Sequence, residues 1–210
     1  LEMFGGEFQS PAANAELLAA TFTADPRNGT VASSLGSLAL EQGAYSAASG
    51  VLESAILLSH PSQSGYLRLA MDEALAWWGE GKPEVALRQI ATRARAINQV
   101  LKQVRIRQED LDQVQRDEVN AMDFPPPPGL ALLRTVIIAH QGTENTRDEA
   151  IESLFRAFDF ATFENARRRQ ILNRKLEEID ADSSDEIDEQ ARANAKEQIA
   201  VNLRALRLQL

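Results

Sequence analysis

Residues 35–55 read LGSLALEQGAYSAASGVLESA, and this stretch decides the fold. Leucines and small residues recur in it at helical spacing, and Gln42-Gly43 gives a turn signal near its middle. Such a pattern predicts two short antiparallel helices that bury facing stripes. Alternating β-branched and aromatic residues, which would predict strands, are scarce here and along the whole chain.

The same pattern extends outward from this stretch. Turn signals rich in glycine, proline and small polar residues stand at residues 25–29, 59–65 and 79–83. Segments of about 12–16 residues lie between them, a usual length for helices in globular proteins. We therefore expect an all-α fold.

Seven positions of the first helix pair carry small or apolar side chains at a distinctive spacing. These positions are Leu35, Gly36, Gly43, Tyr45, Ala48, Leu52 and Ala55. With Asp25-Pro26 just ahead of them, these residues resemble a tetratricopeptide repeat. The resemblance implies that the small residues let two antiparallel helices approach closely, while the tyrosine and leucine positions fill the groove between them.

A second unit follows when Ala86 is placed at the position of Ala48. Glu73 then stands where the family has leucine, and Arg93 where it has alanine. The two alanines are 38 residues apart, against about 34 in the family, which an insertion in the loop at residues 60–65 would explain. The matching positions are Ala70, Ala74, Trp77, Gly81, Ala86 and Ile90. With a helix upstream that carries Ala13, Leu17 and Ala20, the resemblance covers about residues 10–95.

The resemblance implies a binding groove for a protein partner. In this family the first helix of each repeat lines the concave face, which here assigns to the groove Thr30, Ser33, Ser37, Leu40, Arg68, Met71, Leu75 and Trp78. Two units make only a small groove. Trp78 is therefore expected either in this groove or buried by the helices that follow.

One long connecting helix is predicted over residues 83–122, because Pro83 suits a first turn and no glycine or proline follows before Met122. Its apolar residues form a seam of roughly three heptads, at Ile90, Ala94, Ile97, Leu101, Val104 and Leu111. Such a seam needs a partner helix. Either the C-terminal half of this chain or another subunit would supply it.

The proline-rich segment at residues 123–129 is taken as the main break of the chain, because four consecutive prolines cannot continue a helix. It is expected to be a rigid turn, with a ligand for a proline-recognising domain as the alternative.

A helical bundle is expected over residues 130–210. Residues 130–139 are apolar nearly all round, which predicts a buried helix. Capping-box spacings at residues 146–149 and 183–186 predict two helix starts, and a break is expected near Asp159. Residues 1–9 are expected to be a flexible start or a remnant of cloning.

Composition argues against several classes of function. The 31 acidic and 22 basic residues give a net charge of −9, which disfavours general nucleic-acid binding. The chain has no cysteine, which favours an intracellular setting, and no stretch is apolar enough to span a bilayer. Only His60 and His140 are present, and no catalytic, cofactor or metal motif occurs. We expect no enzyme activity, no cofactor and no metal.

One basic cluster interrupts this acidic background, at Arg167, Arg168, Arg169, Arg174 and Lys175. It is expected to be the solvated face of an amphipathic helix, since Glu164, Glu177 and Glu178 flank it. A docking strip for an acidic partner or a nucleic acid is the alternative.

Two functions fit these observations. The first is a non-catalytic protein-interaction or scaffolding module, built from the repeat groove and the long helix. The second is a structural subunit of a larger assembly, such as a viral or phage particle component or a filament. An accessory domain of an enzyme is a third, minor reading.

Overall fold

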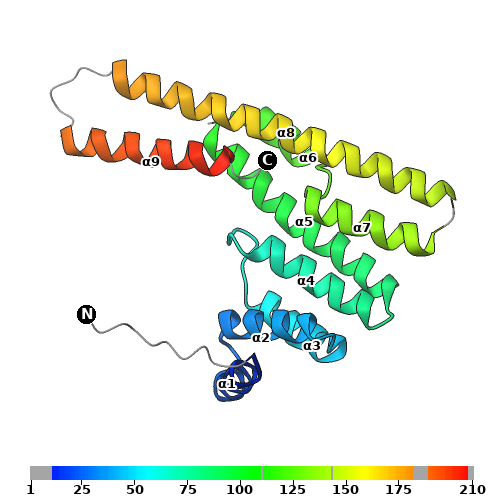
Figure 1. Ribbon diagram of the computed structural model, residues 1–210. Helices are drawn as coiled ribbons and strands as arrows, with labels where there is room; N and C mark the ends of the chain where they lie inside the picture. Colours follow the sequence, from blue (N-terminus) through cyan, green and yellow to red (C-terminus); the bar gives the residue numbers. More distant parts are fainter. Residues whose placement is uncertain (1–10, 110, 143, 182–188, 208–210) are drawn as a thin grey trace, which may run out of the picture. The chain divides into compact units, whose positions relative to one another are not determined.

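The all-α expectation is confirmed. The computed structural model describes residues 11–109, 111–142, 144–181 and 189–207. These residues form nine helices and no strand (Figure 1): α1 (Pro11–Ala24), α2 (Gly29–Glu41), α3 (Tyr45–Leu57), α4 (Tyr66–Gly79), α5 (Pro83–Gln108), α6 (Gln113–Ala121), α7 (Pro128–Gln141), α8 (Glu144–Ala181) and α9 (Glu189–Arg207). The predicted start at residues 1–9 and the capping box at residues 183–186 lie outside the described residues.

The chain forms two compact units, Leu1–Leu154 and Phe155–Leu210, with the boundary inside α8. The proline-rich segment is therefore not the main break, since it lies within the first unit. The reason is the helix that follows it: α7 packs against α4 and α5 and shares their core.

In the first unit, α2 and α3 form the helix pair that residues 35–55 predict. Ala48, Leu52 and Ala55 of α3 are fully buried. Gly36 of α2 lies so close to Leu52 that a Cβ atom at Gly36 would stand 2.5 Å from the Leu52 Cγ. The small residue is what allows this approach, as the spacing implied.

The α2–α3 and α4–α5 connections are built alike. Gly43 and Gly81 both have a positive φ, 71° and 81°, directly after the helix ends. In each turn the next residue donates a backbone hydrogen bond five residues back, Ala44 to Ala39 at 2.9 Å and Lys82 to Trp77 at 3.0 Å. Glycine suits this helix ending because it lacks a Cβ. Gly43 and Gly81 are 38 positions apart, which is the same spacing that the sequence gives for Ala48 and Ala86.

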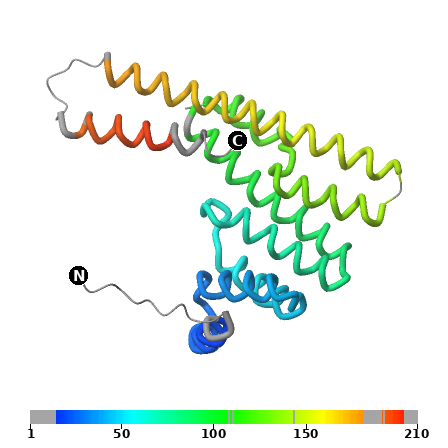
Figure 2. Tube along the Cα trace, in the orientation of Figure 1, coloured from blue at the N-terminus to red at the C-terminus, as the bar shows by residue number. Residues whose placement is uncertain are grey.

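The core of the first unit lies between α2, α3, α4, α5 and α7. Figure 2 shows α4, α5 and α7 side by side, with α2 and α3 next to α4. The prediction of a buried helix over residues 130–139 is only partly correct for α7. Leu130, Leu133 and Ile137 are buried, whereas Leu132 and Val136 remain 49% and 41% exposed on its outer face.

The helix that begins at Pro83 is shorter than predicted. It ends at Gln108, and a separate helix α6 begins at Gln113. Asp112 causes this second start: its side chain accepts a 2.9 Å bond from the Gln115 backbone N–H, and the Gln115 side chain accepts one from Asp112 N–H. This capping box offers the backbone an alternative to helix continuation. The apolar seam of α5 finds its partners in this chain, among them α4, α6 and α7.

The proline-rich segment is a turn held by α5. The Asn98 amide, which is buried, donates hydrogen bonds from Nδ2 to the carbonyl oxygens of Phe124 at 2.7 Å and Pro125 at 3.0 Å. Lys102 donates a third bond to the Asn120 carbonyl at 2.8 Å. Pro128 occupies the first turn of α7, where its missing N–H leaves no partner unbonded. These contacts agree with the expected rigid turn.

We expect Asn98→Ala to lower the free energy of unfolding by about 1–3 kcal/mol, because two carbonyl oxygens at the segment lose their donor. Urea unfolding followed by circular dichroism measures the change. Gln99→Ala, at the exposed neighbouring position, is the control and should change stability by less than about 0.5 kcal/mol. Equal stability of the two variants would show that the Asn98 bonds do not hold the segment.

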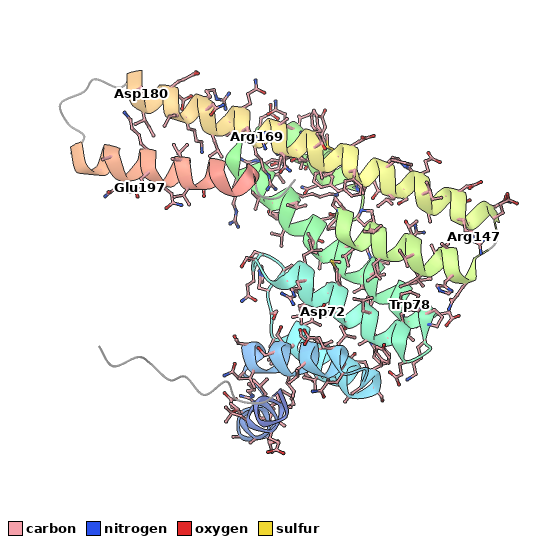
Figure 3. The ribbon with its side chains drawn as sticks, in the orientation of Figure 1. Asp72, Trp78, Arg147, Arg169, Asp180 and Glu197 are labelled. Atoms are coloured by element: carbon pink, nitrogen blue, oxygen red, sulfur yellow. The ribbon has the colours of Figure 1, made fainter. Side chains whose placement is uncertain are left out.

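The second unit contains α9 and the part of α8 from Phe155 onward. The break predicted near Asp159 is wrong, because α8 is continuous from Glu144 to Ala181. No glycine or proline occurs in that range to end it. The helix also begins two residues before the capping box predicted at Thr146. Within this unit, Lys196 of α9 forms an ion pair with Asp180 of α8, which is labelled in Figure 3.

Candidate functional site

A pocket of about 350 Å³ lies where α2 and α4 begin and α3 ends. The first two turns of α2 form one wall, and the end of α3 with the following loop forms the second. The start of α4 closes the third side. The lining residues are Gly29, Thr30, Ser33, Ser34, Leu58, Ser59, Gln63, Gly65, Tyr66 and Leu69.

The pocket is polar without being charged. Serine and threonine hydroxyls, one amide and one phenol line it, beside two leucines and two glycines, and none of these ten residues carries a charge at neutral pH. Hydroxyls and amides both donate and accept hydrogen bonds, so they suit a peptide backbone or a neutral side chain.

Some of the residues predicted to form a groove lie in or near this pocket. Thr30 and Ser33 line the pocket. Further along α2, the Ser37 hydroxyl donates a 3.0 Å hydrogen bond to the Asp72 carboxylate of α4, which Figure 3 labels. Arg68 lies one turn before Asp72, 3.9 Å from its carboxylate, and its side chain is 79% exposed. The structure therefore brings Thr30, Ser33, Ser37 and Arg68 to one α2–α4 surface.

The other half of the predicted groove is not open. Leu40 and Leu75 are partly buried against the core. Met71 faces α7, where a Cβ atom added to Gly129 would stand 2.8 Å from its sulfur. Trp78 (Figure 3) lies edge-to-face against His140 of α7, with ring centroids 5.7 Å apart. Of the two expectations for Trp78, packing by later helices is the one observed, because α7 covers this side of α4.

The sequence analysis missed one contact beside this site. Glu73 of α4 is fully buried, and Arg93 of α5 donates to its two carboxylate oxygens from Nε and Nη2, both at 2.9 Å. The hydrogen bond that Arg93 donates to Glu73 raises the pKa of Arg93 above its ordinary value. The sequence did contain a sign of this contact, because Glu73 and Arg93 are the two positions that depart from the repeat pattern. Taken together as opposite charges, they would have predicted the pair.

The basic cluster of α8 is largely occupied by its own helix. Arg167 donates three hydrogen bonds to the Glu164 carboxylate, the shortest at 2.7 Å, and Arg174 lies 3.8 Å from Glu178. Arg168 and Arg169, the latter labelled in Figure 3, are partly buried, whereas Lys175 is exposed. The expected pairing with neighbouring acids is thus present at Arg167 and Arg174, but only Arg174 and Lys175 are exposed as a solvated face would be. A docking strip for an acidic partner or a nucleic acid stays an alternative prediction.

In the parts of the chain that the structure describes, no three side chains of His, Asp or Glu come together as metal ligands would. None of the helices described there combines the length and the apolar character that a membrane crossing requires. His60 instead contacts the nearby Ser62 hydroxyl, 2.7 Å from Nδ1.

Comparison with known proteins gives no family assignment: no family model, no curated protein and no solved structure matches this chain.

Proposed function

We propose that this chain is a non-catalytic protein-interaction module, built on tetratricopeptide-like helix pairs, that binds a segment of a partner protein at the α2–α4 surface. One observation carries the proposal. The pocket of about 350 Å³ coincides with two of the positions, Thr30 and Ser33, that the repeat resemblance assigns to a binding groove.

The chemistry of the surface indicates how a partner would bind. A neutral side chain would enter the pocket between Leu58 and Leu69, and hydroxyl groups around it would bond the partner's backbone. Arg68, exposed beside the pocket, would favour an acidic residue next to the inserted one. Because two helix pairs offer a short surface, the bound segment should be short and the affinity modest.

Ser33→Trp tests the site by filling the pocket with a large ring. The probe is a set of short peptides selected on the wild-type chain from a displayed random library. We expect their affinity for Ser33→Trp to fall at least about tenfold, measured by fluorescence polarisation, because the inserted side chain loses its space.

Trp78→Ala is the matched comparison. It should reduce thermal stability, since the ring packs against His140, while leaving peptide affinity within about threefold of wild type. The proposal fails if selection yields no binding peptides, or if Ser33→Trp binds them as well as the wild type does. Circular dichroism confirms that Ser33→Trp remains folded.

A further inference from the structure

The connection between α3 and α4 is twice as long as the one between α1 and α2. Eight residues, 58–65, join α3 to α4, whereas four residues, 25–28, join α1 to α2. The difference corresponds to the 38-residue spacing of Ala48 and Ala86, which exceeds the repeat spacing of about 34 residues. The longer connection also lies beside the pocket, so its additional residues are placed where a partner would bind.

Both connections contain the same backbone turn. In each, the N–H of the fourth residue donates to the carbonyl oxygen of the first, from Asn28 to Asp25 at 3.1 Å and from Gln63 to His60 at 2.9 Å. A proline is the second residue of each turn, where its fixed φ suits a β-turn. Asn28 and Gln63 therefore hold equivalent positions.

The side chain of the first residue fixes each turn in the same way. The Arg27 N–H donates to Oδ1 of Asp25, and the Ser62 N–H donates to Nδ1 of His60, both at 3.2 Å. Because a backbone N–H can only donate, Nδ1 of His60 is the acceptor here. His60 thus does in the second turn what Asp25 does in the first.

The extra length of the α3–α4 connection consists of two residues on each side of this turn. Leu58 and Ser59 precede it, and Ser64 and Gly65 follow it. Three of these four residues line the pocket, together with Gln63 from the turn itself. The additional residues and the last residue of the turn therefore form one wall of the pocket.

The extra residues also change what the last residue of the turn does. Asn28 directly precedes α2 and caps it, since its side chain accepts a 3.2 Å bond from the Val31 N–H. Gln63 is separated from α4, whose N-cap is Gly65 and which has no side-chain cap. Its Oε1 accepts a 3.3 Å bond from the His60 N–H. Among the described residues, none accepts a hydrogen bond from its Nε2.

We infer that this loop determines which segments the α2–α4 pocket accepts, with Gln63 as the specificity-determining residue. Gln63 is exposed at the rim of the pocket, where the backbone of a bound segment passes. It donates from Nε2 to a backbone carbonyl oxygen of that segment, because its own carbonyl already accepts from His60. His60 is a positioning residue that fixes the turn. This inference rests on the proposed function, since it concerns the same pocket.

Fluorescence polarisation with the peptides selected on the wild-type chain tests Gln63. Gln63→Glu keeps an acceptor for the His60 N–H but removes the donor, so peptide affinity should fall at least about tenfold. The ratio to wild type should persist from about 0.1 to about 1 M salt, because salt screens charge repulsion but does not replace a lost donor. Ser64→Ala, exposed in the same loop and outside the pocket lining, is the matched control and should bind within about threefold of wild type.

Two substitutions test the positioning role of His60. His60→Ala should weaken peptide binding about three- to tenfold, because the Ser62 N–H loses its acceptor. His60→Asn should bind within about twofold of wild type, since asparagine at the first position of a turn accepts the same bond. Hydrogen exchange at the Ser62 N–H, followed by NMR without peptide, should be faster in His60→Ala than in the other two chains.

The outcomes separate this inference from the proposed function. Wild-type affinity of Gln63→Glu, or a loss that disappears at high salt, overturns the role of Gln63, while Ser33→Trp still reports on the pocket itself. Equal affinities of His60→Ala and His60→Asn overturn the role of His60. If selection yields no binding peptide, the proposed function and this inference fail together.

Discussion

Arg93→Ala is expected to lower the free energy of unfolding by about 3–5 kcal/mol. The Glu73 carboxylate is fully buried, and both of its oxygens accept hydrogen bonds from the Arg93 guanidinium. Removing the guanidinium leaves a charge in the α4–α5 interface without a counter-charge or donors. A buried ion pair gives little net stability, but a buried charge that has lost its partner is strongly destabilising.

The double variant Glu73→Leu with Arg93→Ala places at both positions the residues that the repeat family has there. We expect it to recover most of the loss and to be within about 1 kcal/mol of the wild type, because an apolar pair needs no hydrogen bonds. Urea unfolding of the wild type, both single variants and the double variant gives the coupling energy. Additive losses in the double variant would show that the two side chains do not depend on each other.

Gly36→Ala is expected to destabilise the chain by about 1–3 kcal/mol, although alanine favours helices over glycine. A Cβ atom at this position would stand 2.5 Å from Cγ and 2.6 Å from Cδ2 of Leu52, which is itself fully buried and cannot move aside freely. The α2–α3 pair would have to separate.

Gly50→Ala is the matched control on the adjacent helix. A Cβ atom there meets nothing within 4 Å, so the higher helix propensity of alanine should stabilise the chain by about 0.5–1 kcal/mol. Thermal unfolding by circular dichroism compares the two variants, which should shift the midpoint in opposite directions. Stabilisation by Gly36→Ala would contradict the close approach of α2 and α3.

The sequence predicted the ends of helices well where a glycine directly follows the helix. Gly43 and Gly81 end α2 and α4 because the positive φ after each helix suits glycine. The same reasoning failed where a weaker signal competed with helix propensity. The Asp112–Gln115 capping box ends one helical run and starts another, although no glycine or proline marks the place. Near Asp159, by contrast, an expected break is absent.

The candidate site was predictable only in part. Repeat spacing named Thr30, Ser33, Ser37 and Arg68, which come together on the α2–α4 surface. It could not show that α7 would return to cover Met71 and Trp78, because that contact joins residues about 60 positions apart and depends on how the proline-rich segment turns.

The sequence by itself determined the helical class, the equivalence of the α2–α3 and α4–α5 turns, and the residues that bury the first helix pair. These follow from periodicity, helix-ending glycines and small side chains, which act over a few residues. Only the tertiary structure decided which side of α4 stays open and that Glu73 and Arg93 share one buried contact. Those outcomes depend on which helix covers which face, and packing between distant segments sets that choice.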